Sequence, residues 1–332
     1  MSHRKSKKAS MKPIVLIIFL VLLAVISYLG LENDFKLPGG ESETPTASIY
    51  HSTQDAQGFL TPNTDSPSTD DQGSTFCAYF VDVGQGDCIF LRSPSGKTML
   101  IDCGEYSEYE VVDNFLKEQN VSKLDVVVAT HPHSDHMGGM RLIIQNYDIG
   151  TFYMPDKEHT TNAYEKMIEQ LVEKDVDTVF ATAGKYISWD SEVEAMILSP
   201  IEGVTYADLN SYSIAIRFEY GEMSLLAAGD AEHDAEELML ERFTPDELRS
   251  TVFKASHHGS STSNSEEFLN AIYPDCVVIQ LGANNDYGHP HEEVLDRFFE
   301  LYLDIYRNDI HGTVLVEFTK HDYNVICEKN VG

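Results

Sequence analysis

Four side chains that commonly bind metals fall within the hexapeptide HPHSDH at residues 131–136. The apolar run 124–130 leads into it and is rich in β-branched residues, which predicts a buried strand ending at the hexapeptide. Imidazole nitrogens and carboxylate oxygens suit zinc, manganese or iron. Because a catalytic ion keeps an open coordination position, four ligands are too many for one ion. The HxHxDH spacing therefore predicts two ions, one on the first two histidines and the other on Asp135 and His136.

Two later apolar runs end in the same way. The run 224–228 leads to Asp230, and the run 251–255 leads to the pair His257 and His258. A carboxylate can bridge two cations, so Asp230 is the predicted shared ligand. One histidine of the pair would complete the shell of the second ion, and the spacing alone leaves open which one.

A third group of histidines lies near the end of the chain. His289 and His291 occupy the Gly- and Asn-rich segment 284–291. With this pair, seven of the 13 histidines fall in three short segments, which random surface use would not produce. The clustering indicates that the three segments contribute to one site.

The charge balance limits the partners that the protein can have. The chain of 332 residues has 23 basic and 54 acidic side chains, a net charge of −31, and 42% hydrophobic residues. Such a surface repels phosphate backbones in general. Broad, non-specific DNA affinity is therefore disfavoured unless metal ions or a local basic patch offset the charge. No obligate protein partner is indicated.

The N-terminal segment indicates a location at the cell membrane. A basic tail at 1–12 precedes the uncharged apolar run 13–30, which is near the length of a membrane-spanning helix and longer than most signal-peptide cores. The positive-inside rule then places the rest of the chain outside the cytoplasm. We expect a single-pass anchor, with a cleaved signal as the alternative. The polar stretch 31–74 is expected to form a flexible, disordered linker.

From residue 75 the pattern changes to that of a folded domain, expected over 75–332. Strand-like runs at 76–83, 88–91 and 97–104 precede a helix whose apolar face is predicted to include Val111 and Val112. Further strands and helices alternate to the end of the chain. This alternation of strands and helices predicts an α/β fold in which two sheets pack face to face with helices outside. The widely spaced cysteines are expected to be free buried thiols, although a bridge between Cys77 and Cys103 is a second interpretation.

Several motifs resemble one known family. They are DVGQGD at 82–87, DCG at 102–104, HPHSDHMGG at 131–139, HHGS at 257–260 and YGHPH at 287–291. The domain is similar to the metallo-β-lactamase-fold hydrolases, and specifically to the soluble domain of the competence protein ComEC and its stand-alone relatives. The resemblance implies a four-layer αβ/βα sandwich with a site for two divalent ions, zinc or manganese, at one edge.

The resemblance also implies how the ligands divide between the two ions. The first ion would take His131, His133 and Asp230, and the second would take Asp135, His136, Asp230 and His258. The superfamily usually supplies a third histidine to the first ion, but the corresponding segment 208–213 reads DLNSYS. The first ion is therefore expected to bind less tightly, which favours manganese or an ion completed by substrate.

The expected function follows from these ions. Two cations lower the pKa of a water between them, generate hydroxide and clamp the attacked and leaving oxygens. Asp135 could orient the hydroxide, His257 could contact a phosphoryl oxygen, and His289 is a candidate general acid or oxyanion stabiliser. We expect a phosphodiesterase that acts on DNA, as a nuclease linked to DNA uptake, or on a small phosphocholine-type cell-wall ester. The alternatives are an ester or amide hydrolase, such as a lactonase or β-lactamase, and a metal-binding surface protein without catalysis.

Overall fold

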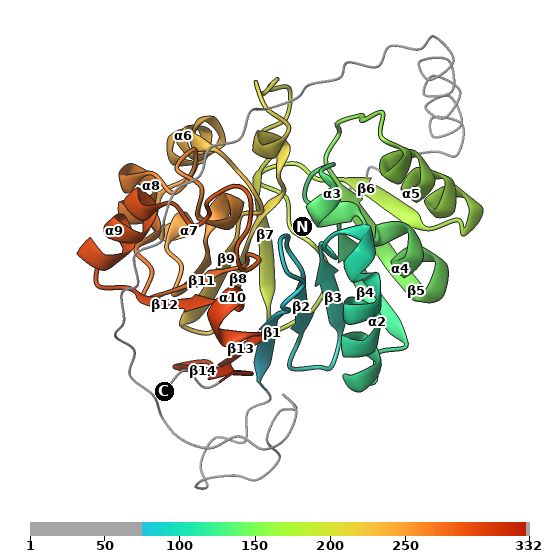
Figure 1. The fold of residues 1–332 in the computed structure, drawn as a ribbon, viewed down its shortest axis with the longest axis horizontal. Coiled ribbons are helices and arrows are strands. Elements are labelled where there is room, and N and C mark those ends of the chain that lie inside the picture. The colour runs from blue at the N-terminus through green and yellow to red at the C-terminus, as the bar shows by residue number, and fades with distance from the viewer. Residues whose placement is uncertain (1–74, 330–332) are drawn as a thin grey trace, which may run out of the picture.

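The computed structural model describes residues 75–329, which form two β-sheets packed face to face with helices on both outer sides (Figure 1). The predicted basic tail, membrane anchor and linker at 1–74 lie outside the described residues. Between residues 75 and 329, no helix is long and apolar enough to cross a membrane.

The first sheet has eight strands and contains both ends of the described chain. In spatial order its strands are β14 (Tyr323–Cys327), β13 (Val314–Phe318), β1 (Phe76–Phe80), β2 (Ile89–Arg92), β3 (Thr98–Ile101), β4 (Lys123–Val128), β5 (Asp148–Met154) and β6 (Asp177–Phe180). The strands β3 to β6 are parallel to one another. Since β1 and β3 are both antiparallel to β2, β1 runs in the same direction as β3.

The second sheet has six strands and repeats this arrangement. In spatial order they are β12 (Asp304–Arg307), β11 (Cys276–Ile279), β10 (Val252–Lys254), β9 (Met223–Ala227), β8 (Ala215–Tyr220) and β7 (Glu194–Ser199). The strands β9 to β12 are parallel. Parallel strands deliver the residues that follow them to one edge of the sheet, so Asp230 after β9 and His257 after β10 lie at the same edge.

The helices cover the outer face of each sheet. The helices α2 (Tyr109–Glu118), α4 (Met140–Asn146) and α5 (Asn162–Glu173) pack on the first sheet. The helices α6 (His233–Arg242), α7 (Pro245–Leu248), α8 (Glu266–Ile272) and α9 (Glu292–Glu300) pack on the second. The two short helices α3 (Ser134–Met137) and α10 (Asn308–His311) lie in loops that follow β4 and β12.

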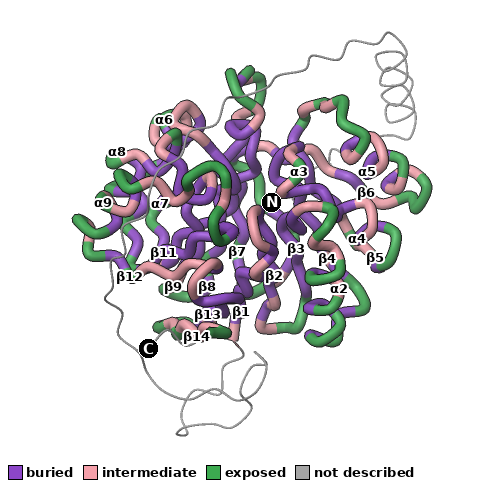
Figure 2. Tube along the Cα trace, viewed as in Figure 1, coloured by how far each residue is buried: buried purple, intermediate pink, exposed green. Residues whose placement is uncertain are grey.

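Three apolar layers hold these elements together. One lies between the first sheet and its helices, a second between the two sheets, and a third between the second sheet and its helices. The buried residues follow the strands and the inner faces of the helices (Figure 2). The order helix, sheet, sheet, helix is the predicted αβ/βα sandwich.

The structure corrects several details of the predicted elements. Val112 is buried on the inner face of α2, but Val111 is 40% exposed because it lies one residue, about 100°, round the helix. The edge strand β12 was not predicted, because its four residues DIYR are only partly buried and lack an apolar run. All five cysteines are free, and only Cys327 is not fully buried.

Candidate metal centre

The metal loop is fixed to the end of its strand by a buried aspartate. Asp102 follows β3 in a left-handed conformation, with φ 57°. Its carboxylate accepts hydrogen bonds from the backbone N–H of Thr130 at 2.8 Å and from the Thr130 hydroxyl. The same carboxylate lies 2.8 Å from His136 Nδ1. The loop after β4 is therefore held in place from the neighbouring strand.

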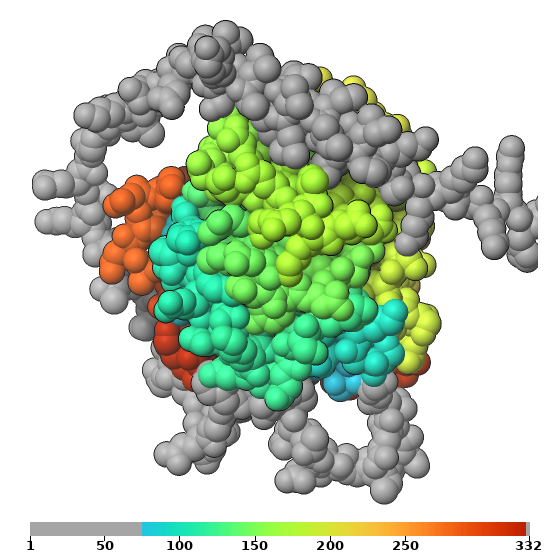
Figure 3. All heavy atoms as spheres, turned by 90° about the vertical axis from the view of Figure 1, so that its right-hand side faces the viewer, coloured from blue at the N-terminus to red at the C-terminus, as the bar shows by residue number. Residues whose placement is uncertain are grey.

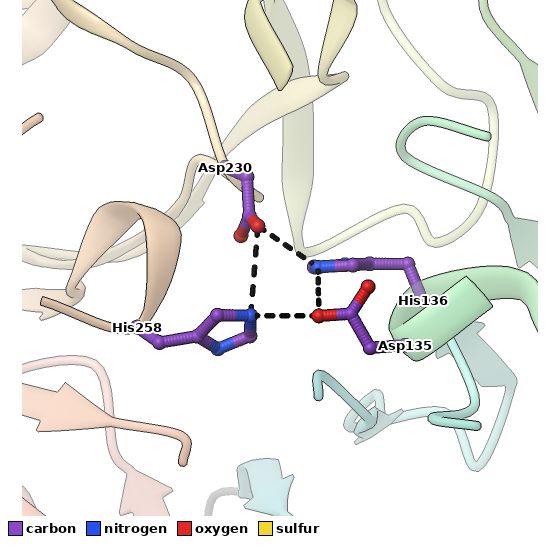
Figure 4. A group of neighbouring side chains, drawn as sticks. All are labelled: Asp135, His136, Asp230 and His258. Carbon is purple, nitrogen blue, oxygen red and sulfur yellow. Dashed lines mark hydrogen bonds and ion pairs between the residues drawn. The ribbon is translucent and has the colours of Figure 1, made fainter. Parts of the chain in front are cut away.

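Four of the predicted ligands converge on one point (Figure 4). Asp135 and His136 come from α3, Asp230 from the loop after β9, and His258 from the turn after β10. One donor atom from each lies within 4.8 Å of the others. His136 Nε2 is 3.1 Å and His258 Nε2 is 3.5 Å from the same oxygen, Asp230 Oδ2. His258 Nε2 is also 3.3 Å from Asp135 Oδ2.

The two imidazoles of this group are oriented by partners on their other nitrogen. His136 Nδ1 bonds to Asp102, and His258 Nδ1 lies 2.8 Å from the carbonyl oxygen of Gln280. Such bonds fix the ring and direct Nε2 towards the ligand position. The structure thus places His258, rather than His257, in the group of four.

The first two histidines of the loop form a second, looser group. His131 Nε2 and His133 Nδ1 are 3.0 Å apart, and His131 Nε2 is 4.0 Å from Asp230 Oδ2. His131 Nδ1 lies 3.2 Å from the hydroxyl of Ser213, which accepts a hydrogen bond from the N–H of Asp230. Asp230 therefore lies between the two groups, where a shared ligand has to be.

Asn210 and His257 lie beside this looser group. His257 Nε2 is 3.9 Å from Asp230 Oδ2 and 3.5 Å from Asn210 Nδ2. Asn210 is buried and donates to Glu232 Oε1 at 3.2 Å, while its own Oδ1 has no hydrogen-bond partner within the described residues. Asn210 comes from the segment 208–213 in which the superfamily histidine is missing, and it offers an oxygen in place of that nitrogen.

Charges within the cluster shift the ionisation of its members. Burial opposes ionisation of Asp230, but His136 and His258 outweigh it and hold the pKa of Asp230 well below its usual value. The pKa of Asp135 is lowered in the same way, against burial, by His136 and His258. Burial also disfavours charged imidazoles, yet Asp230 and Asp135 raise the pKa of both His136 and His258. The carboxylates therefore favour the protonated form of these two histidines.

The pKa values of His131 and His289 are lowered, in contrast to those of His136 and His258. Burial lowers the pKa of His131 well below its usual value, with a further contribution from His136. Burial and the neighbouring rings of His258 and His257 lower the pKa of His289 to about 3. The His289 ring is 6.1 Å from that of His258 and 5.4 Å from that of His257. A neutral His289 is suited to donate a hydrogen bond to an oxyanion, which favours the second of its two predicted roles.

A buried lysine beneath the cluster was missed by the sequence analysis. Lys254, at the end of β10, has a fully buried side chain and forms an ion pair with Asp87. Its Nζ is 3.7 Å from Asp230 Oδ1 and donates to the carbonyl of Gly229 at 3.1 Å. Burial works against the charge, but Asp87 and Asp230 raise the pKa of Lys254. A charged residue inside the apolar run 251–255 was the available signal.

The turn that contains the paired histidines is strained. His257 and His258 both adopt left-handed conformations, with φ 49° and 53°, and Gly259 follows with φ 80°. Non-glycine residues seldom adopt this conformation and usually do so where the surrounding structure imposes it for function. In this conformation the two rings face different residues. His258 faces Asp135, while His257 faces Asn210 and Glu232.

The residues present fit a divalent metal centre. The group of four supplies two carboxylates and two imidazoles, the donor set that zinc and manganese accept. Asn210 Oδ1 is a buried oxygen without a hydrogen-bond partner among the described residues, which is compatible with a role as a metal ligand. A buried His/Asp centre at the edge of an αβ/βα sandwich defines a metal-dependent hydrolase.

Comparison with known proteins identifies the family. Residues 81–282 match the model of the metallo-beta-lactamase superfamily, and the chain belongs to that superfamily. It is 28% identical over 251 residues to ComE operon protein 3 of Bacillus subtilis, a match covering 70% of this chain and 32% of that protein. It is 30% identical over 236 residues to competence protein ComA of Neisseria gonorrhoeae, covering 70% and 31%. The predicted resemblance to competence proteins is confirmed, and the chain spans about a third of the length of these relatives.

The fold is also found among solved structures. The crystal structure of CmlA, a diiron β-hydroxylase from Streptomyces venezuelae, aligns with a TM-score of 0.51 and 16% identity, over 75% of this chain and 55% of that one. At this identity the similarity shows a shared fold only.

Proposed function

We propose that this chain is a phosphodiesterase that uses two divalent ions to cleave a nucleic acid strand at the edge formed by β4, β9 and β10. The observation that carries the proposal is the arrangement around Asp230. Asp230 belongs to the group of four donors, and its Oδ2 also lies 4.0 Å from Nε2 of His131, which contacts His133. A shared carboxylate between two ligand groups is what a two-metal hydrolase requires.

The side chains divide the work of cleavage. When bound, the two ions supply a hydroxide nucleophile at neutral pH and neutralise the charge of the phosphoryl group. Asp135, an ionised member of the group of four, accepts a hydrogen bond from the attacking oxygen and orients it. His289, held neutral, donates a hydrogen bond to the phosphoryl oxygen on the open side of the cluster. His257 is 20% exposed and lies at the same opening, where it contacts the substrate.

The location and the substrate belong to the same proposal. The apolar run 13–30 with its basic flank supports a membrane anchor that leaves the domain outside the cytoplasm. The relationship to competence proteins supports DNA as the substrate, in place of a small phosphodiester. Protease treatment of intact cells tests the location, because a C-terminal tag that is protected from added protease contradicts the proposal.

Hydrolysis assays on the purified full-length chain test the activity. The chain is loaded separately with zinc and with manganese and assayed on bis-p-nitrophenyl phosphate, single- and double-stranded DNA, p-nitrophenyl phosphocholine, nitrocefin and a lactone. Asp135→Asn keeps the shape of the side chain and removes its charge, and it is expected to abolish turnover. His321→Ala removes an exposed histidine far along the chain from the metal loop and serves as the matched control.

The substrate panel separates the competing functions. Metal-dependent cleavage of DNA that Asp135→Asn loses and His321→Ala keeps supports the proposal. Faster turnover of nitrocefin or the lactone would show that the enzyme cleaves amides or esters. Bound metal without turnover of any substrate would identify a binding protein.

A further inference from the structure

A cavity of about 370 Å³ lies beside the metal loop. It is lined by Tyr106, Gly138, Arg141, Asn162, Ala163 and Lys166. We propose that this cavity binds a nucleotide unit next to the scissile phosphodiester of a polynucleotide strand, with its phosphate on Arg141 and Lys166 and its base against Tyr106. The inference rests on the proposed phosphodiesterase function and specifies the substrate as a strand.

The topology places this cavity at the edge of the sheet that carries the metal centre. The helices α4 and α5 are the next long helices after the carboxyl ends of the parallel strands β4 and β5, so their first turns lie on the metal side. Arg141 is in the first turn of α4, and Asn162 and Lys166 are at the start of α5. Figure 3 shows the face of the domain on which these helices lie.

The lining of the cavity is continuous with the metal loop. Gly138 follows His136 by two residues and packs against the backbone of Tyr106, where an added Cβ would lie 2.4 Å from the Tyr106 nitrogen. Ser134, at the start of α3, donates a hydrogen bond to Glu105 at 2.7 Å. A ligand in the cavity therefore lies against the same short helix that supplies Asp135 and His136.

Within residues 75–329, Arg141 has no partner that would explain its position. Its side chain is partly buried and forms no hydrogen bond or ion pair with any other residue between 75 and 329. An unpaired guanidinium is notable in a chain with 54 acidic and 23 basic side chains. A guanidinium binds phosphate through two parallel hydrogen bonds, which makes arginine the preferred residue for phosphate recognition.

Lys166 adds a second positive charge that a phosphate can recruit. It forms an ion pair with Glu169 at 2.7 Å, and both side chains are about half exposed. Exposed pairs three residues apart on a helix are weak. A dianionic or diester phosphate on Arg141 therefore competes readily for Lys166. Together the two residues form a local basic patch, the feature that the acidic chain needs to approach a polyanion.

The remaining lining residues suit the rest of a nucleotide. The ring of Tyr106 is 56% exposed, and the amide of Asn162 is exposed at the mouth of the cavity. Bases stack on exposed aromatic rings with little dependence on sequence. A polymer of alternating phosphates and short alcohols would use the two cations but would gain nothing from Tyr106, which favours a nucleic acid strand.

Binding of a labelled single-stranded oligonucleotide to the full-length, manganese-loaded chain tests the inference by fluorescence anisotropy, with Asp135→Asn present in every variant so that the strand is bound and not cleaved. Arg141→Ala is expected to weaken binding about tenfold, the usual effect of losing one charge-assisted contact. The slope of log K against log salt should become shallower by about 0.7, as expected for one lost phosphate contact on a single strand. Tyr106→Ala is expected to weaken binding about tenfold, while Tyr106→Phe retains it.

Lys117→Ala is the matched control. Lys117 is an exposed residue in the last turn of α2, away from the metal edge, and its loss changes the net charge equally. Equal weakening by Arg141→Ala and Lys117→Ala would overturn the inference, since the effect would then be one of overall charge. Equal loss by Tyr106→Phe and Tyr106→Ala would overturn the role of the ring. Because binding is the readout, a chain that binds through Arg141 but hydrolyses no phosphodiester would contradict only the proposed function.

Discussion

The two halves of the metal centre differ in how close their imidazoles lie to the carboxylate of Asp230. In the group of four, His136 and His258 are each fixed through Nδ1 by a buried partner, and both point at Asp230 Oδ2 from 3.5 Å or less. In the other half, His131 Nε2 and His257 Nε2 are 4.0 and 3.9 Å from the same oxygen.

On the proposed two-ion function, the carboxylate of Asp230 serves one prebuilt site and one site that has to adjust. The group of four is charged and tightly supported, so it needs little rearrangement to bind an ion. The half with His131 and Asn210 has fewer strong ligands, and it includes the partly exposed ring of His257. We therefore expect sequential loading, with the first ion to bind held by the group of four.

Removing the carboxylate of Asp230 should abolish metal binding in both halves of the centre. Asp230→Ala deletes the oxygen that both groups face, so metal content should fall towards zero and phosphodiester hydrolysis by about 10³-fold or more. Elemental analysis after desalting, together with the hydrolysis assay, measures both effects. Asp246→Ala, which removes an exposed carboxylate on α7, should change neither. Retention of two ions by Asp230→Ala would show that the carboxylate is not shared.

The support beneath the group of four can be broken separately. Lys254→Met leaves Asp87 buried without its ion pair and should lower the free energy of unfolding by about 3–5 kcal/mol. Urea unfolding of the metal-free protein measures this. Adding Asp87→Asn to the variant removes the uncompensated charge and should restore much of the loss. A double variant no more stable than Lys254→Met would indicate that packing, rather than charge, is the contribution of the lysine.

The adjustable half should respond to a stronger ligand. Asn210→His restores an imidazole at the position where the superfamily usually has one, and it should tighten the weaker ion about tenfold, or about 1.4 kcal/mol. Competition with a metal-binding dye measures the two affinities. Asn146→His places a histidine on the exposed surface of α4 and is the control. Unchanged affinity of the weaker ion would place its ligands away from Asn210.

The release of protons on metal binding should also differ between the two halves, although this effect is smaller than those of the substitutions above. In the metal-free protein the pKa values of His136 and His258 are raised by Asp230 and Asp135 against the effect of burial, so both rings favour the protonated form more than a free imidazole does. Metal binding must displace these protons, and the affinity of the tight site should rise with pH up to and beyond 6.5, the ordinary pKa of an imidazole. His131, whose pKa burial lowers, has no such proton to release. Calorimetry in buffers of different ionisation enthalpy measures the release, and its absence from the tight site would contradict the assigned charges.

The sequence predicted the parts of the centre that are close together in the chain. HxHxDH, Asp230 and the histidine pair each follow an apolar run, and this pattern predicts strands that end at a common edge. The pattern could not show whether His257 or His258 is the ligand, because this depends on a left-handed turn that the residue types do not predict.

The hydrophobic pattern of the sequence could not predict contacts between segments that are far apart in the chain. Lys254 and Asp87 pair across 167 positions, and each is unremarkable in its own segment. The edge strand β12 was missed for a related reason, since its hydrogen bonds to β11 stabilise four residues that have little apolar character.

The direction of β1 determines which way the metal centre faces. Because β1 runs parallel to β3, its last residue Phe80 lies on the metal side and its first residue Phe76 at the opposite end of the sheet. The described chain therefore begins at the end of the sheet opposite the metal edge. A substrate that reaches the metal edge approaches the described domain from the side opposite to the N-terminal end of β1.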